Sequence, residues 1–195
     1  MRVIKSEQSG DVLPALVTPE TLIADSGGGL KAGDPRLAAA AQAASNAIRR
    51  YCRWHIAPVI EETMILDGSG GSVQQLKSAH VVDILEMKIG GITFPPSHYA
   101  WSEDGLIELH SKLGQWARFP KMFRSVEVTL QHGFDEVPDL SAIASQIARF
   151  ALASPMGRTR EQAGQIAVSW GTAEGMRFSE SALEMMKPYR IQTMP

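Results

Sequence analysis

The chain has 195 residues, of which 44% are hydrophobic, and its 19 basic and 21 acidic residues give a formal net charge of −2. This length suits one core with appendages. A near-zero charge with no long run of one sign excludes a surface that binds nucleic acid tightly through its phosphates. The single cysteine, Cys52, excludes an internal disulfide framework and favours a reducing compartment. No apolar run reaches about 18 residues, so we expect neither a signal peptide nor a membrane span.

Residues 1–33 are expected to form an N-terminal arm. They show no sustained hydrophobic period, and the consecutive glycines Gly27, Gly28 and Gly29 are costly to order. Thr18 followed by Pro19 is the one helix-start signal, with a capping hydroxyl before a proline at the first helical position. We therefore expect one short helix within the arm.

The first long helix is predicted over residues 35–53. Asp34 is a candidate N-cap, Pro35 suits the first helical position, and Pro58 prevents continuation. The apolar positions recur at steps of four and three, namely Leu37, Ala41, Ala44, Ile48 and Tyr51. Because this face is rich in alanine, another helix or a neighbouring subunit can approach it closely.

Between residues 59 and 132 the hydrophobic period changes to two, which is typical of strands with one wet face. Val126, Val128 and Leu130 alternate with polar residues, and Ile60, Met64 and Leu66 follow a weaker version of the same pattern. Glycine-rich turns separate these segments. The pattern predicts five to seven short strands in a small antiparallel sheet or barrel.

A second helix is predicted over residues 139–153, before Pro155, with one apolar side formed by Leu140, Ile143, Ile147, Phe150 and Ala151. The fold class is therefore α+β: a helical pair with an inserted antiparallel sheet or barrel, an N-terminal arm and a C-terminal tail. We expect residues 34–156 to form this helix-β-helix core and residues 157–195 to form the extended tail.

The tail contains a short alternating piece, Ile166, Val168 and Trp170, and a short helix is predicted from Ser181 with Glu184 as its capping-box partner. These apolar groups cannot be buried by the tail alone, so it is expected to dock on the core or on another chain. Cutting the chain after about residue 157 is then expected to leave a folded core.

Metal and catalytic sites have weak support in the sequence. Cys52 and His55 form half of a zinc motif, but a structural zinc needs four ligands and no second pair is present. Cys52 at a helix end rich in aromatics is typical of an inert buried thiol. The five histidines are scattered and are interpreted as surface or partly packed side chains. We expect no catalytic residue, no metal and no cofactor.

The end of the first helix carries arginines and aromatic residues within a few positions. Arg49 and Arg53 are four residues apart, so they are expected to share a face and pair with carboxylates of a neighbour or of the same fold. The alternative is a solvated face that complements the helix dipole. Tyr51 and Trp54 are interpreted as packing anchors that hold the helix on the sheet.

The order of several motifs over about residues 34–155 resembles the head-to-tail connector or adaptor proteins of tailed bacteriophages. The motifs are Ala44-Ser45-x-x-Ile48-Arg49-x-Tyr51-Cys52-x-Trp54-His55-Ile56-Ala57-Pro58, Leu66-Asp67-Gly68, Tyr99-x-Trp101-x-x-Asp104-Gly105 and Val126-x-Val128-Thr129-x-x-His132-Gly133. Thr159-Arg160-Glu161-Gln162 and the late Lys187-Pro188-Tyr189-Arg190 also match the way such chains end. Each motif is a packing motif, and their order carries the resemblance.

The resemblance implies a non-enzymatic virion protein, made in the host cytoplasm and located in the neck at the head-tail interface. It would form a homo-oligomeric ring, commonly a dodecamer, that binds the portal protein and the next neck or tail protein. Packaged DNA would pass through the lumen without sequence-specific binding. The expected subunit or portal contacts are Arg49, Arg53, Ile166, Val168, Trp170 and Tyr189. The alternatives are a small soluble peptide- or ligand-binding module and a hydrolase that uses Cys52 or a histidine.

Overall fold

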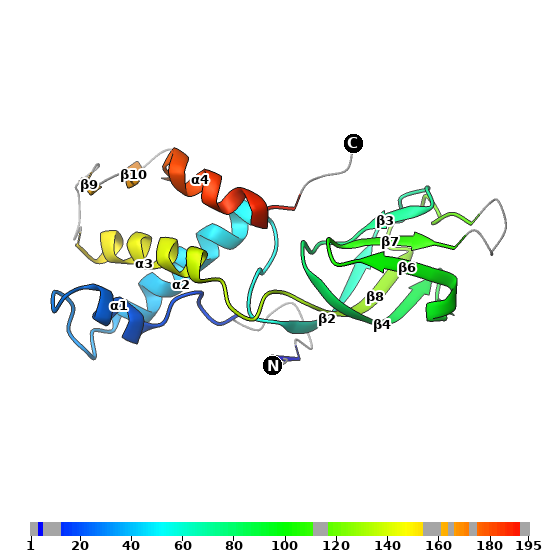
Figure 1. The fold of residues 1–195 in the computed structure, drawn as a ribbon, viewed down its shortest axis with the longest axis horizontal. Helices are drawn as coiled ribbons and strands as arrows, with labels where there is room; N and C mark the ends of the chain where they lie inside the picture. The colour runs from blue at the N-terminus through cyan, green and yellow to red at the C-terminus, as the bar shows by residue number, and fades with distance from the viewer. Residues whose placement is uncertain are drawn as a thin grey trace. The chain divides into compact units, whose positions relative to one another are not determined.

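The chain folds into two compact units (Figure 1). The computed structural model describes residues 4–5, 13–110, 117–153, 161–163, 166–171 and 175–191. A helical unit is built from residues 13–53 and 137–190, and a β-unit comprises residues 54–136 with the terminal segments 1–12 and 191–195. Along the chain, the strands of the β-unit lie between the two long helices of the helical unit, which confirms the predicted α+β class. The division into arm, core and tail stays a prediction, because compactness does not show which segments fold independently.

The helical unit contains α1 (Pro19–Asp25), α2 (Arg36–Cys52), α3 (Pro138–Ala153) and α4 (Glu180–Met186). α2 packs along α3, and α1 contacts both of these helices. α1 begins as predicted: the Thr18 hydroxyl accepts a hydrogen bond from the backbone N–H of Thr21, with Pro19 in the first turn. Leu22 on α1 is fully buried. The short arm helix is therefore packed within its own chain.

The ends of α2 follow from local hydrogen bonds. Its buried stripe contains the predicted Leu37, Ala41, Ala44 and Ile48. The helix starts at Arg36, one residue later than predicted, and the Asp34 carboxylate accepts a hydrogen bond from the Arg36 N–H at 2.9 Å. It stops at Cys52, where Arg53 takes a left-handed conformation with φ 71°.

α3 buries a stripe that differs from the predicted one at its end. Leu140, Ile143 and Ile147 are buried as expected, but Ala151 is exposed and Phe150 is half-buried. Ala144, Ala148 and Leu152 complete the stripe instead. The helix follows a period of 3.6 residues, so the buried line moves from Ile147 to Ala148 and Leu152.

The last part of the chain is folded on the helical unit. α4 starts after Ser179, whose hydroxyl accepts a hydrogen bond from the Ala182 N–H at 3.2 Å, so the predicted start at Ser181 is two residues late and Glu184 is not its capping partner. Met186 is fully buried, and α4 contacts α3. A short 3₁₀ helix, η3 (Lys187–Tyr189), follows. This segment finds its burial within its own chain, the first of the two alternatives expected for the tail.

Three strands precede α4. They are β9 (Glu161–Ala163), β10 (Ile166–Gly171) and β11 (Gly175–Arg177), and β10 lies between the other two in an antiparallel sheet. β10 coincides with the alternating segment predicted from Ile166, Val168 and Trp170.

The β-unit has two sheets in the described part of the chain. The five-stranded sheet has the order β1-β2-β8-β4-β5, and the three-stranded sheet has the order β3-β7-β6. The strands are β1 (Ile4–Lys5), β2 (Ile60–Leu66), β3 (Val73–Gln75), β4 (Val81–Ile89), β5 (Ile92–Phe94), β6 (Tyr99–Ser102), β7 (Leu106–Leu109) and β8 (Val126–His132), with a 3₁₀ turn, η1 (Pro96–His98), between β5 and β6. β1 adds to β2 in parallel, whereas the other pairs in these two sheets are antiparallel.

β8 is the centre of the larger sheet. It pairs along its whole length with β2 and with β4, so that Val128 lies between Met64 and Met87. Its burial alternates strictly, with Val126, Val128, Leu130 and His132 buried. The predicted phase of this strand is confirmed, as is the inward set Ile60, Met64 and Leu66 on β2.

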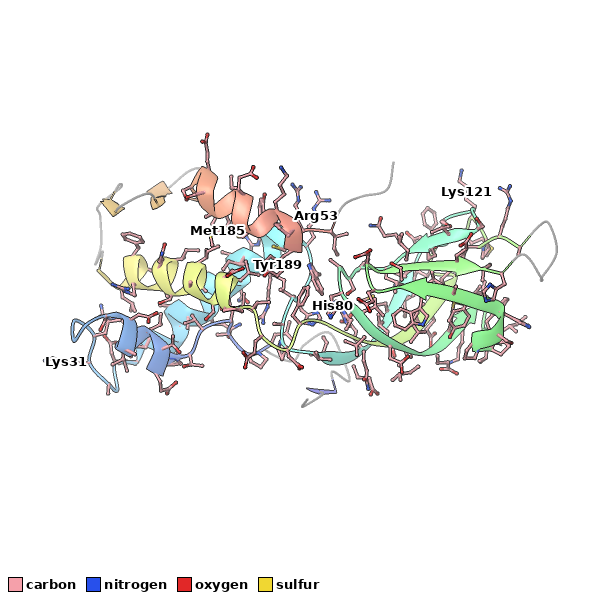
Figure 2. The ribbon with its side chains drawn as sticks, viewed as in Figure 1. Lys31, Arg53, His80, Lys121, Met185 and Tyr189 are labelled. Atoms are coloured by element: carbon pink, nitrogen blue, oxygen red, sulfur yellow. The ribbon has the colours of Figure 1, made fainter. Side chains whose placement is uncertain are left out.

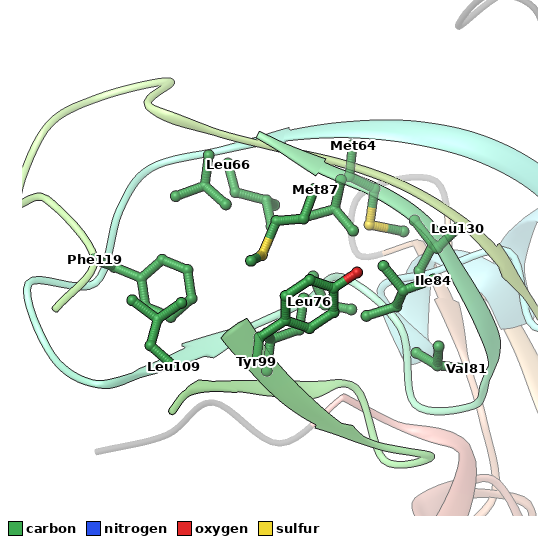
Figure 3. Packing of buried hydrophobic residues seen from close by; sticks show 13 residues of the cluster. Met64, Leu66, Leu76, Val81, Ile84, Met87, Tyr99, Leu109, Phe119 and Leu130 are labelled. Carbon is green, nitrogen blue, oxygen red and sulfur yellow. The ribbon is translucent and has the colours of Figure 1, made fainter. Parts of the chain in front are cut away.

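Both sheets of the β-unit share one hydrophobic core (Figure 3). Met87, Ile107 and Leu130 are fully buried, and Phe119 closes the end of the cluster opposite Val81. Burying a side chain of this size contributes about 1.5–3 kcal/mol. The alternative of a sheet or a barrel is therefore resolved as two sheets packed around a common core.

Candidate interaction surfaces

Gln42, Ser45 and Arg49 on α2 form a row of polar side chains that holds the segment before α1. The Ser45 hydroxyl accepts a hydrogen bond from the Leu16 N–H at 2.8 Å, and the Gln42 side chain donates to the Leu13 carbonyl at 3.1 Å. Arg49 donates to the Pro14 carbonyl at 2.7 Å and is largely buried. Burial lowers the pKa of its guanidinium to about 10. Arg49 thus has a structural role within its own unit.

Arg49 and Arg53 do not share a helix face, contrary to the expectation from their spacing. Arg49 lies on the buried stripe of α2, whereas Arg53 is exposed and lies beyond the last helical residue with φ 71°. Residues four apart lie on the same face only while the backbone is helical, and Arg53 lies beyond the end of the helix. Contacts of either arginine with another chain stay a prediction.

Tyr51 and Trp54 pack in different units. Tyr51 meets the edge of Phe178 at 5.8 Å between ring centroids, and the Arg190 guanidinium lies 5.3 Å from its ring centre. Trp54 is buried in the β-unit, where it stacks on His132 at 6.3 Å and contacts Phe134. Each aromatic ring is an anchor within its own unit, and their role in holding the helix on the sheet stays a prediction.

The predicted contact residues near the C-terminus are placed as follows. Tyr189 ends η3 and is half-buried, and burial raises its pKa, with a further contribution from Asp139. Ile166, Val168 and Trp170 lie on β10, but their side chains are outside the part of the chain that the structure describes. Their contacts with another chain stay predictions.

A cluster of histidines and aromatic rings lies at one end of the β-unit and was missed by the sequence interpretation. His55 and His132 are buried, and their ring centroids are 4.4 Å apart. The Nε2 atom of His132 lies 3.3 Å from a carboxylate oxygen of Glu62, and this hydrogen bond lowers the pKa of the Glu62 carboxyl. His80 stacks on Phe134 at 4.3 Å.

The cluster is built for packing. The Nδ1 atom of His132 is buried and has no hydrogen-bond partner among the described residues, and its Nε2 atom faces Glu62. The Nε2 atom of His55 lies 2.9 Å from the Pro58 carbonyl oxygen. Gly133 has φ 112°, and a side chain there would collide with His55 and with this carbonyl. A substrate cannot reach the ring of His132, which is 1% exposed.

Cys52 is not arranged as a nucleophile. It is fully buried and its thiol points at the Met186 carbonyl oxygen, 3.9 Å away. Burial raises the pKa of the thiol to about 12 although Arg190 acts in the opposite direction. At neutral pH the reactive thiolate is therefore scarce, which disfavours the hydrolase alternative.

The described ranges contain neither a metal-ligand cluster nor a helix suited to a membrane. There, no three His, Cys, Asp or Glu side chains converge as a set of metal ligands. None of the helices in those ranges combines the length and apolar character needed to traverse a bilayer.

Two exposed patches lie at opposite ends of the β-unit. We call residues 121–124, Lys-Met-Phe-Arg, the apolar tip; they connect to the loop after β2. We call Trp101, Glu103 and Asp104, around the turn from β6 to β7, the acidic turn; these side chains are exposed as well. Figure 2 shows Lys121 at one end of the β-unit and His80, next to the acidic-turn end, at the other.

No family model matches this chain, and no curated protein matches it either. Solved structures do match its fold. A chain in the neck of an empty GTA (gene transfer agent) particle, computed with C6 symmetry, matches with a TM-score of 0.59 and 16% identity, over 97% of this chain and 96% of that chain. A chain in the neck of a native GTA particle, computed with C12 symmetry, matches with a TM-score of 0.55 and 16% identity, over 95% and 96%. The likeness spans both units, so this chain has the whole fold of those neck chains.

Proposed function

We propose that this protein is a structural component of the neck of a phage-like particle. The observation that carries the proposal is a fold match over nearly the full length of both chains to proteins from GTA necks. The order of sequence motifs supports the same class independently of the fold. A buried, protonated Cys52 and inaccessible His132 agree with a role that does not involve catalysis.

The protein acts as a head-to-tail adaptor in this proposal. Copies form a ring beneath the portal protein, extend the DNA channel and present a surface to the next neck or tail protein. The C12 and C6 symmetries of the matched necks support a ring, and twelve copies are the number proposed for it. A ring repeats a heterologous contact, so each copy needs two different complementary patches. The virion is the proposed location, after synthesis in the host cytoplasm.

The charge of the chain suits a channel through which DNA slides. A net charge of −2 gives no strong general attraction to phosphates. The proposed contacts with other chains include Arg53 and Tyr189, which reach the surface, and the β10 segment at Ile166, Val168 and Trp170. Arg49 is buried, and in this proposal it acts indirectly, by holding the segment at Pro14 through its hydrogen bond to the Pro14 carbonyl.

The proposal is tested by mixing the purified chain with the portal protein of the same particle and following the mixture by size-exclusion chromatography with light scattering. A stable complex with several copies of the chain per portal ring is expected. A chain that stays monomeric and elutes apart from the portal would contradict the proposal.

A further inference from the structure

The apolar tip exposes large hydrophobic side chains at the end of the β-unit. Phe123 is 87% exposed and Met122 is 66% exposed. Ile92, at the turn between β4 and β5, is 69% exposed at the same end of the larger sheet, where the Gly90 N–H donates to the Ser125 carbonyl at 2.8 Å. Neighbouring exposed apolar groups of this kind mark a surface for a partner.

The backbone of the tip is held in place by hydrogen bonds. The Met122 carbonyl accepts from the Gly68 N–H and from the Ser125 hydroxyl, both at 2.9 Å. The Arg124 N–H donates to the Asp67 carboxylate at 2.8 Å. A side chain at position 68 would collide with the Pro120 carbonyl, so glycine permits this close approach. An aromatic side chain on a fixed backbone loses little entropy on binding and is typical of an interface hot spot.

The charges beside the tip define the chemistry of its partner. Lys121 and Arg124 flank the two apolar residues, and neither forms an ion pair with another described residue. The tip therefore fits an apolar surface that also carries carboxylates.

The β-unit itself carries such a surface at its other end. Trp101 is partly exposed, and Glu103 and Asp104 form no ion pair within the described ranges. The Glu103 carbonyl accepts from the Val81 N–H at 2.7 Å, and Val81 pairs with His132 at the end of β8. The tip instead precedes Val126, where β8 begins. One rigid strand thus separates a basic apolar patch from an acidic aromatic one.

We propose that the apolar tip of one copy binds the acidic turn of a second copy of this chain. The two patches differ, so the contact is heterologous and repeats from copy to copy, as a ring requires. The inference rests on the proposed function because ring formation brings the copies together. A stable interface buries about 1,200–2,000 Å² in total, so the tip and turn form its central anchor and flanking surfaces supply the rest.

Charge exchange tests the pairing in the full-length chain. The variants are Phe123→Ser, Lys121→Glu with Arg124→Glu, Glu103→Lys with Asp104→Lys, and the fourfold exchange. Ile65→Ser is the control, because Ile65 is an exposed apolar side chain of β2 that belongs to neither patch. Ring formation on the portal is titrated for each. Phe123→Ser should weaken self-association roughly 30-fold and each charge reversal roughly tenfold. The fourfold exchange should restore it, and the control should match the parent chain.

Cross-linking tests the contact directly. An Arg124→Cys chain is mixed with an Asp104→Cys chain and the portal, and a bismaleimide is added. Cys52 is buried, so only the new thiols react readily. Dimers should form in the mixture and not when Lys31→Cys, in the helical unit, replaces Asp104→Cys.

The outcomes separate this inference from the proposed function. A ring on the portal without the 124–104 cross-link and without rescue by charge exchange overturns the inference and leaves the function standing. The cross-link without portal binding supports the inference and overturns the function. Binding of the parent chain, but not of Phe123→Ser, to vesicles of phosphatidylglycerol and phosphatidylcholine would identify a lipid surface as the occupant and overturn the pairing.

Discussion

The β-unit and the helical unit bury their side chains by different means. The hydrophobic core of the β-unit comes from one continuous stretch, residues 54–136, and it is a set of cross-strand neighbours centred on β8. The helical unit is assembled from two stretches far apart in the chain. The Arg49 side chain binds the segment before α1, and α4 contacts α3 and carries the buried Met186. The β-unit should therefore survive losses at the chain ends that the helical unit does not.

The largest expected effect comes from cutting the chain after Gly157. The cut removes α4, with its buried Met186, and the Phe178 and Arg190 partners of Tyr51. We expect amide exchange across α2 and α3 to become fast while β8 stays protected, as hydrogen exchange with mass spectrometry would show. This revises the sequence-based expectation of an intact core, because the removed segment is part of the helical unit. Equal protection of α2 in the cut and full-length chains would contradict the claim that the helical unit depends on the C-terminal segment.

Leu130→Ala is the matching change in the β-unit. Leu130 is fully buried at the centre of the core, and its loss should lower the free energy of unfolding by about 2–5 kcal/mol. Denaturant titration combined with hydrogen exchange should assign this loss to β2, β4 and β8. Leu85→Ala, at an exposed position of the same sheet, is the control and should change stability little.

Arg49→Met removes a donor while keeping most of the packing of the side chain. The bond to the Pro14 carbonyl is lost, and we expect about 1–3 kcal/mol of destabilisation. The Leu16 amide, which donates to Ser45, should exchange faster. Arg50→Met at an exposed neighbouring position should leave both quantities unchanged. If both variants behave alike, the segment before α1 is not held by this row of side chains.

The smallest expected effect concerns Glu62. Its pKa is lowered in the folded chain by the hydrogen bond with His132, so its stabilising contribution is present above the ordinary pKa of 4.5 and is lost as the pH falls through the lower folded value. Glu62→Gln should therefore flatten the acid side of a plot of unfolding free energy against pH. Equal slopes for Glu62→Gln and the parent chain would contradict a stabilising role for the hydrogen bond with His132.

Local periodicity predicted the parts of the fold that repeat along one element. The alternation in β8 and the stripe on α2 were correct because each depends on the spacing of side chains within one strand or helix. The central place of β8, between β2 and β4, was not predictable from spacing, since strand pairing is set by contacts distant in sequence. The same applies to β1, which joins the sheet from the chain end.

The candidate surfaces were predicted less well than the fold. His132 continues the inward phase of Val126, Val128 and Leu130, so alternation alone could have placed it inside. Arg49 likewise follows Ser45 by one helical turn on the buried stripe. Both side chains are polar, which favoured an interpretation as surface residues. Only the structure shows that Arg49 is hydrogen-bonded to the Pro14 carbonyl and His132 to the Glu62 carboxylate. Exposed residues such as Phe123 carry no periodic signal at all.

Electron microscopy of the full-length chain bound to its portal would show directly whether the copies form a ring. We expect a closed ring, proposed to contain twelve copies, continuous with the portal channel and with the tip of each copy against the acidic turn of the next. Isolated copies beside an unmodified portal, or an open chain without rotational symmetry, would contradict it.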